Sequence, residues 1–450
     1  MDLSIANGLI ADPCQGIYSC MNVGINEGKI AALSRFPIQA DSYIEATGKV
    51  VCPAFIDIHL HEALPDPKGP GWASPIFAWA ARMGVGTALG GNCGEGPSRP
   101  LSYLDELEQR ELPVNVGMLA PHAALRLTAG QPDKYAPLNE AQLNSLRQLC
   151  EECLDGGCLG ISLGLRYVPG VEQRELEMLG QVLAHKRGLL AVHLRDDAAG
   201  VLAAASEILE LADTFGLRLQ ISHIGSMAAY GYIDEFLTLV DQWHSRGVDV
   251  LMDCYPYTAF STSIGETTFD PGFQERYAID YSALVVGEGE FEGQHLDEMK
   301  FDYLRREKPN TIIIAHVMLD AEVAIALTHP GVMVASDGFL HGACGHPRAA
   351  GSFPRFLRHY VLEKKLMSLY QGIAKITTLP ARQLGLSNRG NLALGNIADI
   401  TIFDPMTICD HANFQNCGAA PDGIEWVLLA GKVVCKQGGI LKINQGKTLR

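Results

Sequence analysis

The middle of the chain alternates short apolar runs with longer segments of helical period, and this alternation constrains the fold more than any other feature. A short apolar run followed by a helix is typical of a βα unit in a parallel sheet. Eight such runs favour a (β/α)8 barrel over a doubly wound sheet, although the pattern alone is also compatible with an open sheet. The runs read AFIDIHLH, GTALGGNCG, VNVGMLAPH, CLGISLGL, LLAVHLR, LQISHIG, VDVLMDCYPY and VMVASDG.

A ninth apolar run, TIIIAHV at 311–317, falls between the last two, and we assign it to an inserted excursion. Both ends of the chain instead alternate apolar and polar residues in short pieces separated by turn residues, which predicts small antiparallel strands. Neither end alone could bury both faces of a sheet. We therefore expect a composite β-sandwich domain of residues 1–53 and 390–450, and a barrel of residues 54–389 with an inserted lid around 262–310.

Composition excludes several classes of partner. The formal net charge is −16 and Lys and Arg do not cluster, which argues against nucleic acid because phosphate binding needs such clusters. No run of 18 apolar residues is present and the first residues lack the regions of a signal peptide, so we expect no membrane segment and a cytoplasmic location. The 12 cysteines are too dilute for a disulfide scaffold.

Reactive side chains gather where five of the apolar runs end. In a (β/α)8 barrel these strand ends meet at the active-site face, and His59 and His61 share one face of their strand, ~6.6 Å apart. Imidazole, thiolate and carboxylate are the usual ligands of zinc-like metals, so the pattern predicts a metal site. Structural histidines bonded to carbonyl groups, or a helix-capping aspartate, are the alternatives for any one of them. The candidates are His59, His61, Cys93, His193, His223 and Asp337.

Over nearly its whole length the chain resembles the amidohydrolase superfamily and, within it, the D-aminoacylase family of N-acyl-D-amino-acid deacylases. FIDIHLH resembles the H-x-H motif of the first strand, and GNCG resembles the cysteine motif of the second. VHLR, SHI and SDG resemble the motifs of the fifth, sixth and eighth strands. Further similar stretches are GISLGLRYVPG, DCYPYTAFST, GHPRAAGSFPRFLRHYV and GNIADITIFDP.

The resemblance implies a zinc enzyme. Cys93, His193 and His223 would hold one tight metal, while His59, His61 and Asp337 would form a possible second, weaker position. Asp337 would be the catalytic general base. The carboxylated lysine that bridges two metals in many relatives has no counterpart in the fourth-strand motif, which agrees with the choice of this family.

The resemblance also implies a small anionic substrate, an N-acyl-D-amino acid that is hydrolysed to a carboxylate and a free D-amino acid. Arg348 would pair with the substrate carboxylate, and the other implied substrate-binding residues are Ser261, Tyr257, His122, Tyr167 and His346.

Three departures from the family pattern leave the substrate side chain open. Glu62 and Ala63 follow the H-x-H motif, where an aromatic residue and an aspartate are usual. Gly225 replaces a pocket lysine, and the lid segment is shorter. Hydrolysis of a cyclic amide such as a hydantoin, or of an isoaspartyl dipeptide, remains an alternative on the same site. A non-catalytic metal-binding barrel is a third reading, and a homo-oligomer is compatible with the sequence.

Overall fold

The computed structural model describes residues 1–62, 75–339, 345–441 and 444–450. Eight parallel strand segments form a closed ring, which confirms the (β/α)8 barrel over the open sheet. The ring closes where Leu60 pairs with Gly338, just beyond the first and last strands. In ring order the strands are β6 (Phe55–Asp57), β7 (Val85–Gly90), β8 (Asn115–Met118) with its continuation β9 (Ala120–Pro121), β10 (Gly160–Gly164), β11 (Leu189–His193), β12 (Arg218–Ile221), β13 (Asp249–Cys254) and β17 (Val332–Val334).

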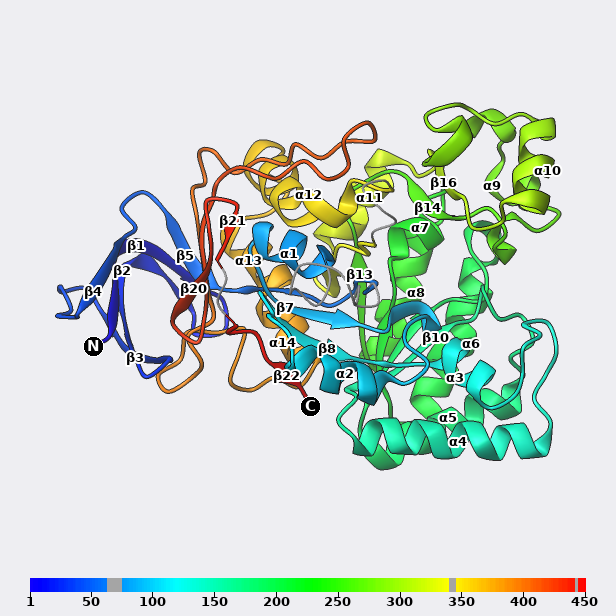
Figure 1. Ribbon diagram of the computed structural model, residues 1–450, viewed down its shortest axis with the longest axis horizontal. Helices are drawn as coiled ribbons and strands as arrows, with labels where there is room; N and C mark the ends of the chain where they lie inside the picture. The colour runs from blue at the N-terminus through cyan, green and yellow to red at the C-terminus, as the bar shows by residue number, and fades with distance from the viewer. Residues whose placement is uncertain (63–74, 340–344, 442–443) are drawn as a thin grey trace.

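Helices follow the strands and cover the outside of the ring (Figure 1). Their apolar faces pack on the strands, as amphipathic helices require. Within the described ranges, no helix is long and apolar enough to cross a membrane. The helices are α1 (Pro75–Arg82), α2 (Pro100–Glu108), α3 (His122–Thr128), α4 (Glu140–Asp155), α5 (Gln173–Lys186), α6 (Val201–Phe215), α7 (Ile224–Ala228), α8 (Ile233–Ser245), α11 (Asp320–Thr328), α12 (Arg348–Arg355), α13 (Leu369–Ile376) and α14 (Thr378–Gln383).

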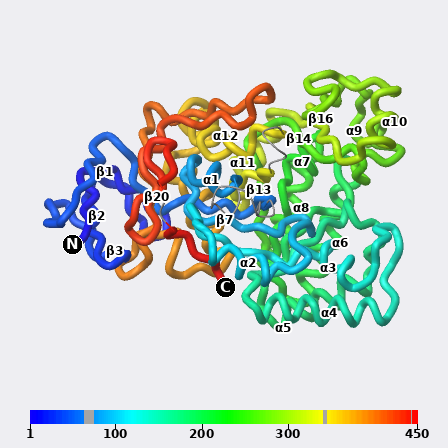
Figure 2. Tube along the Cα trace, viewed as in Figure 1, coloured from blue at the N-terminus to red at the C-terminus, as the bar shows by residue number. Residues whose placement is uncertain are grey.

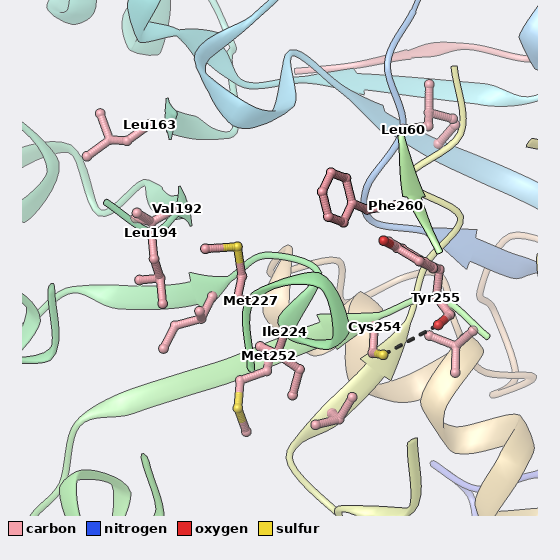
Figure 3. Packing of buried hydrophobic residues seen from close by; sticks show 14 of the residues in the cluster. Leu60, Leu163, Val192, Leu194, Ile224, Met227, Met252, Cys254, Tyr255 and Phe260 are labelled. Carbon is pink, nitrogen blue, oxygen red and sulfur yellow. Dashed lines mark hydrogen bonds between the residues drawn. The ribbon is translucent and has the colours of Figure 1, made fainter. Parts of the chain in front are cut away.

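The barrel is filled by two groups of apolar side chains. A small cluster that includes Ile58, Leu119 and Met333 plugs the inside of the ring, and a larger cluster lies between strands and helices. Figure 3 shows part of the larger cluster, including Met227 of α7 and the thiol of Cys254, which lies 3.4 Å from the carbonyl oxygen of Tyr255. The polar ends of the strands therefore lie next to densely packed apolar side chains.

An antiparallel excursion follows β13 and rises from the barrel at the upper right of Figure 1. Its strands β14 (Phe260–Ser263), β15 (Leu284–Val286) and β16 (Ile312–Ala315) form a separate sheet beside α9 (Phe273–Tyr277) and α10 (Glu298–Glu307). The ninth apolar run is β16, so its assignment to an excursion is confirmed. We call residues 260–315 the lid.

The two ends of the chain meet in one sheet, and Figure 2 shows the blue and red segments side by side. β5 and β18 join the two halves by antiparallel pairing. Hydrogen bonds connect all nine strands, and the sheet folds over a core of its own, as expected of the small β-sandwich. Its strands are β1 (Leu3–Asp12), β2 (Ile17–Asn26), β3 (Lys29–Ser34), β4 (Ser42–Glu45), β5 (Val50–Pro53), β18 (Ile400–Phe403), β19 (Ile424–Leu429), β20 (Lys432–Lys436) and β21 (Gly439–Ile440).

The terminal sheet buries both of its faces. Alternate residues of a strand point to opposite faces. Val50 and Cys52 of β5 accordingly join the large cluster of the barrel, whereas Val51 joins a core that belongs to the sheet itself. A last short strand, β22 (Thr448–Leu449), pairs with the barrel strand β8. The sheet thus packs against one side of the barrel, at β7 and the helices α1 and α13.

Candidate active site

All six predicted metal ligands lie at the carboxyl ends of barrel strands. His193 ends β11, His223 follows β12 directly, and Cys93 lies in the short 3-10 helix η1 (Asn92–Gly94) after β7. Five of the six line one cavity: His61, Cys93, His193, His223 and Asp337. His59 is fully buried beneath them.

Three of these residues have left-handed backbone conformations, which are uncommon for residues other than glycine. The φ angles are 53° at Cys93, 34° at His223 and 47° at Asp337. Such conformations cost about 1–3 kcal/mol each and concentrate at functional sites. Gly91, two residues before Cys93, could not carry a side chain. A Cβ at this position would lie 2.4 Å from the carbonyl oxygen of Leu119.

The donor atoms converge in two overlapping groups. In the first, Cys93 Sγ lies 3.4 Å from His59 Nε2 and 3.3 Å from His223 Nε2. In the second, Asp337 Oδ1 lies 3.4 Å from His59 Nε2 and 3.1 Å from His61 Nε2. Within each group the donor atoms all lie within 4.8 Å of one another. His59 belongs to both groups and lies between the two positions.

His193 stands beside the first group. Its ring centre lies 4.5 Å from that of His223, and it hydrogen-bonds with the Cys93 thiol. Both His59 and His193 therefore adjoin Cys93 and His223, and the His193 ring is the nearer of the two to His223. Burial and the neighbouring His223 lower the pKa of His193 to about 4, so its imidazole is neutral at pH 7, the form that binds metals.

Electrostatics keep the anionic donors ionised. Burial alone would raise the pKa of the Cys93 thiol, but the charges of His59 and His223 lower it well below its ordinary value. Burial would also raise the pKa of Asp337, and here the Arg348 guanidinium and the His59 ring lower it well below its ordinary value. A thiolate, a carboxylate and several imidazoles in a buried cluster are the donor set that zinc prefers, so the residues present fit such an ion.

Asp253 of β13 contacts two of the candidate ligands, His59 and His223, and was not predicted from the sequence. One of its carboxylate oxygens lies 3.3 Å from His59 Nδ1, and the other accepts the His223 amide at 2.8 Å. Gln220 donates to the first oxygen at 2.7 Å. A carboxylate directly after the apolar run VLM of this strand was the signal that could have identified it.

Arg348 lies beside Asp337. Its Nη1 is 2.9 Å from Asp337 Oδ2, and its guanidinium carbon is 4.7 Å from the centre of the Tyr255 ring. Its Nε is buried without a hydrogen-bond partner. Because a buried donor is rarely left unpaired, this nitrogen is available to an anionic ligand.

The other predicted substrate-binding residues divide into two groups. Tyr167 and Ser261 line the cavity, and the Tyr167 ring centre lies 4.6 Å from that of His193. Tyr257, His122 and His346 are not among the residues that line it.

Each of these three side chains has a partner elsewhere. The Tyr257 hydroxyl lies 3.4 Å from the carbonyl oxygen of Pro347, and His122 hydrogen-bonds with Glu175 at 2.7 Å. His346 accepts the amide of Arg348 at 3.1 Å, so it contacts the backbone of the pocket arginine and not the cavity. The contacts of Tyr257 and His122 join distant segments, which local motifs do not reveal.

The departures at Glu62 and Gly225 have structural explanations. Glu62 is half-buried and accepts the Gly91 amide at 2.7 Å, so it braces the glycine-rich loop that carries Cys93. A Cβ on Gly225 would lie 2.8 Å from Met318 Cε and 3.0 Å from Cys254 Sγ. A side chain at residue 225 would therefore meet the core. Ala63 lies outside the described residues.

Comparisons with known proteins agree with this geometry. A sequence model described as the amidohydrolase family matches residues 42–435. The N-acyl-D-glutamate deacylase of Alcaligenes xylosoxydans xylosoxydans is 34% identical over 97% of this chain and 94% of its own length. The D-aminoacylase of the same organism is 28% identical over 100% of this chain and 97% of its own.

A solved structure resembles the whole chain. The N-acyl-D-glutamate deacylase from Bordetella bronchiseptica, complexed with zinc and a phosphonate inhibitor that mimics the tetrahedral intermediate, superposes with a TM-score of 0.89. Its sequence identity is 30%, and the superposition covers 100% of this chain and 99% of that chain.

Proposed function

The chain belongs to the amidohydrolase superfamily and, within it, to the D-aminoacylase family, and we propose that it is a metal-dependent hydrolase of N-acyl-D-amino acids. The reaction adds water to the amide carbonyl and breaks the C–N bond, which yields a carboxylate and a free D-amino acid. The observation that carries the proposal is the convergence of imidazole, thiolate and carboxylate donors beside a buried arginine with an unpaired nitrogen.

We propose that Cys93, His193 and His223, with His59 beside them, would hold a zinc ion, and that His59, His61 and Asp337 would form a second position. When bound, zinc supplies a Lewis acid that polarises an amide carbonyl and lowers the pKa of water.

Asp337 is the proposed general base. Its carboxylate is ionised at neutral pH, so it can accept a proton from the attacking water and deliver that proton to the departing nitrogen. Without that proton the amine would be a poor leaving group.

Arg348 is the proposed anchor of the substrate carboxylate. A planar guanidinium binds a carboxylate through two parallel hydrogen bonds, and its position beside Asp337 places the carbonyl of the bound amide next to the base. A fixed carboxylate also allows only one enantiomer to present its carbonyl in this way. The cavity walls of Tyr167 and Ser261 would enclose the remainder of the substrate.

A cyclic amide or an isoaspartyl dipeptide is the second candidate substrate, because the proposed metal ligands and base would serve any amide. A barrel that binds metal without catalysis is the third candidate, and metal-dependent hydrolysis of any amide would exclude it. The free thiols agree with a cytoplasmic location, which we propose on that ground.

A substrate panel tests the proposal. The zinc-loaded protein is assayed with N-acetyl-D-amino acids, hydantoins and β-aspartyl dipeptides, and free amine is measured. We expect hydrolysis of the N-acetyl-D-amino acids at a rate at least about tenfold above that of the other two groups. Preference for a hydantoin or a β-aspartyl dipeptide would favour the second candidate, and no turnover of any amide would contradict catalysis.

A further inference from the structure

The candidate active-site cavity contains three carboxylates besides that of Asp337. Glu95 lies just after η1, Asp197 lies between β11 and α6, and Glu266 belongs to the lid. Arg348 is the only lysine or arginine among the described residues that line the cavity. Apart from Arg348, the lysine, arginine, aspartate and glutamate residues of the described lining are therefore all acidic.

These carboxylates differ in how their charge is compensated. Glu266 pairs with Lys134 at 3.1 Å. Asp197 accepts the Tyr277 hydroxyl through one oxygen, while its other oxygen is 3.6 Å from Arg276 Nε and has no hydrogen bond although the residue is only 3% exposed. Glu95 makes no side-chain hydrogen bond or ion pair with any described residue, and its side chain is open to the cavity.

A second unpaired polar group lies in the same cavity. Ser261 is 8% exposed, lines the cavity, and its hydroxyl has no hydrogen-bond partner. Buried hydroxyls almost always find a partner in folded proteins. The free oxygen of Asp197 is thus a buried acceptor that a hydrogen-bond donor on a ligand would satisfy, and the Ser261 hydroxyl can accept from such a donor as well.

The charge count limits the side chain of the substrate. Arg348 is assigned to the α-carboxylate, so a second carboxylate on the substrate would find no cation on the described wall and would face Glu95. Two like charges at short range in a cavity repel each other strongly. The site therefore differs from what a substrate with an acidic side chain requires, although the relatives described above include N-acyl-D-glutamate deacylases.

We propose that the substrate carries a cationic group besides its α-carboxylate, and that Glu95, Asp197 and the Ser261 hydroxyl recognise it. An ammonium or guanidinium group pairs with the free carboxylate of Glu95 and donates to the unsatisfied oxygens. This inference rests on the proposed deacylase function and specifies its substrate class.

Two parts of an amide substrate could carry the cation. It could end the side chain, as in N-acyl-D-arginine, or it could be the free amine of an aminoacyl group in place of a simple acyl group. The first source places the charge on the D-amino acid product, and the second places it on the carboxylate product.

Matched substrates test the charge directly. We compare kcat/KM for N-acetyl-D-arginine with N-acetyl-D-citrulline, which has nearly the same shape without the charge, and N-acetyl-D-glutamine with N-acetyl-D-glutamate. Arginine is expected to exceed citrulline by at least about tenfold, and glutamate to fall below glutamine, because charge-assisted hydrogen bonds are about twice as strong as neutral ones. Glycyl-D-citrulline against acetyl-D-citrulline tests the aminoacyl source.

Variants of the cavity carboxylates test which of them recognise the cationic group. Glu95→Gln is expected to reduce the arginine-to-citrulline ratio several-fold, and Asp197→Asn to reduce it as well. Glu210→Gln, an exposed carboxylate on α6, is the matched control and should keep the parent ratio. Metal content is measured for each variant, so that a change in the ratio at unchanged zinc content reports substrate recognition.

The outcomes separate this inference from the proposed function. Hydrolysis of acetyl-D-citrulline or acetyl-D-glutamine without any gain from a cationic group would overturn the inference and leave the deacylase function intact. A preference for acetyl-D-glutamate would overturn it equally. If none of the N-acyl-D-amino acids or glycyl amides is hydrolysed by the zinc-loaded protein, the proposed function fails and this inference fails with it.

Discussion

At the scale of single residues, Asp337 is the side chain on which the proposed chemistry depends most. Its carboxylate contacts His59, His61 and Arg348 at once. Asp337→Asn keeps the size of the side chain but removes the proton acceptor, so kcat should fall about a hundredfold to ten-thousandfold. Zinc content should remain largely intact, because the group formed by Cys93 does not include this residue.

Asp213→Asn, at an exposed position of α6, is the control and should retain the parent rate. The measurement is kcat together with zinc per chain by elemental analysis. A variant of Asp337 that retained most of its activity would contradict the role of general base.

Asp253 acts through the ligands and not on the substrate. Asp253→Asn removes the charge beside His59 Nδ1 while it preserves an acceptor for the His223 amide. Carboxylates in this position orient metal-bound imidazoles, and their loss typically weakens metal affinity 10–100-fold. Zinc competition with a chelator measures this change. Asp249→Asn, at the exposed start of the same strand, should leave the affinity unchanged, and an equal loss in both variants would contradict a specific role for Asp253.

How far the site could be predicted from the sequence depends on whether a residue has a local signal. His59 and His61 could be identified because they share one strand face, and Cys93 because glycines surround it. Tyr257 and His122 lie in convincing motifs, yet their side chains turn to Pro347 and Glu175. Asp197 and Tyr277 meet only when the lid packs on the barrel, so no local pattern predicts their contact.

At the scale of secondary-structure elements, α13 contains a buried cation. Lys375 donates to the carbonyl oxygens of His329 and Val332, at the base of β17. Burial lowers its pKa from 10.5 to about 8. Between these two pH values the folded protein binds fewer protons at this site than the unfolded chain, so the free energy of unfolding should rise with pH across the window. Below about pH 8 Lys375 is charged in the folded protein, and the burial of this charge lowers the free energy of unfolding by its full amount.

Lys375→Met should remove this contribution, which amounts to about 2 kcal/mol between pH 8 and pH 10. Urea unfolding at pH 8 and pH 10 measures it as the difference between the parent and the variant. Lys365→Met, at an exposed position, is the matched control and should show the parent dependence. Identical slopes in Lys375→Met and the parent would contradict the assignment.

The strands and the lid were largely predictable from the sequence because apolar runs that are buried on both faces lack polar residues. The eight runs correspond to the eight ring positions. The way in which the terminal domain packs on the barrel was harder to predict. Val50 and Cys52 pack on the barrel while Val51 packs in the sheet's own core, and the sequence VVC shows no alternation that would reveal two covered faces.

At the scale of the whole molecule, we propose that residues 1–53 and 390–450 form one domain that the barrel needs for folding. Asn115 of β8 donates to Asp399 at 3.0 Å, and the hydroxyl of Thr401 donates to the carbonyl oxygen of Gly84 at 2.6 Å. Phe403 packs on Phe55 with 6.2 Å between ring centres. Residues 54–389 alone would expose this surface and leave Asn115 with fewer partners.

We therefore expect the fragment 54–389 to be insoluble or to unfold without a cooperative transition, whereas the full chain unfolds cooperatively. Circular dichroism with thermal unfolding compares the two. A soluble fragment with a sharp transition would contradict the dependence of the barrel on the terminal sheet.

The central claim for the whole molecule is that the donor cluster makes it a metal-dependent deacylase of D-configured substrates. The most direct test compares chelated and zinc-reloaded protein on the N-acetyl derivatives of D- and L-amino acids. We predict hydrolysis of the D-enantiomers alone, its loss on chelation and its return with zinc. Full activity after verified metal removal, or equal hydrolysis of both enantiomers, would contradict the claim.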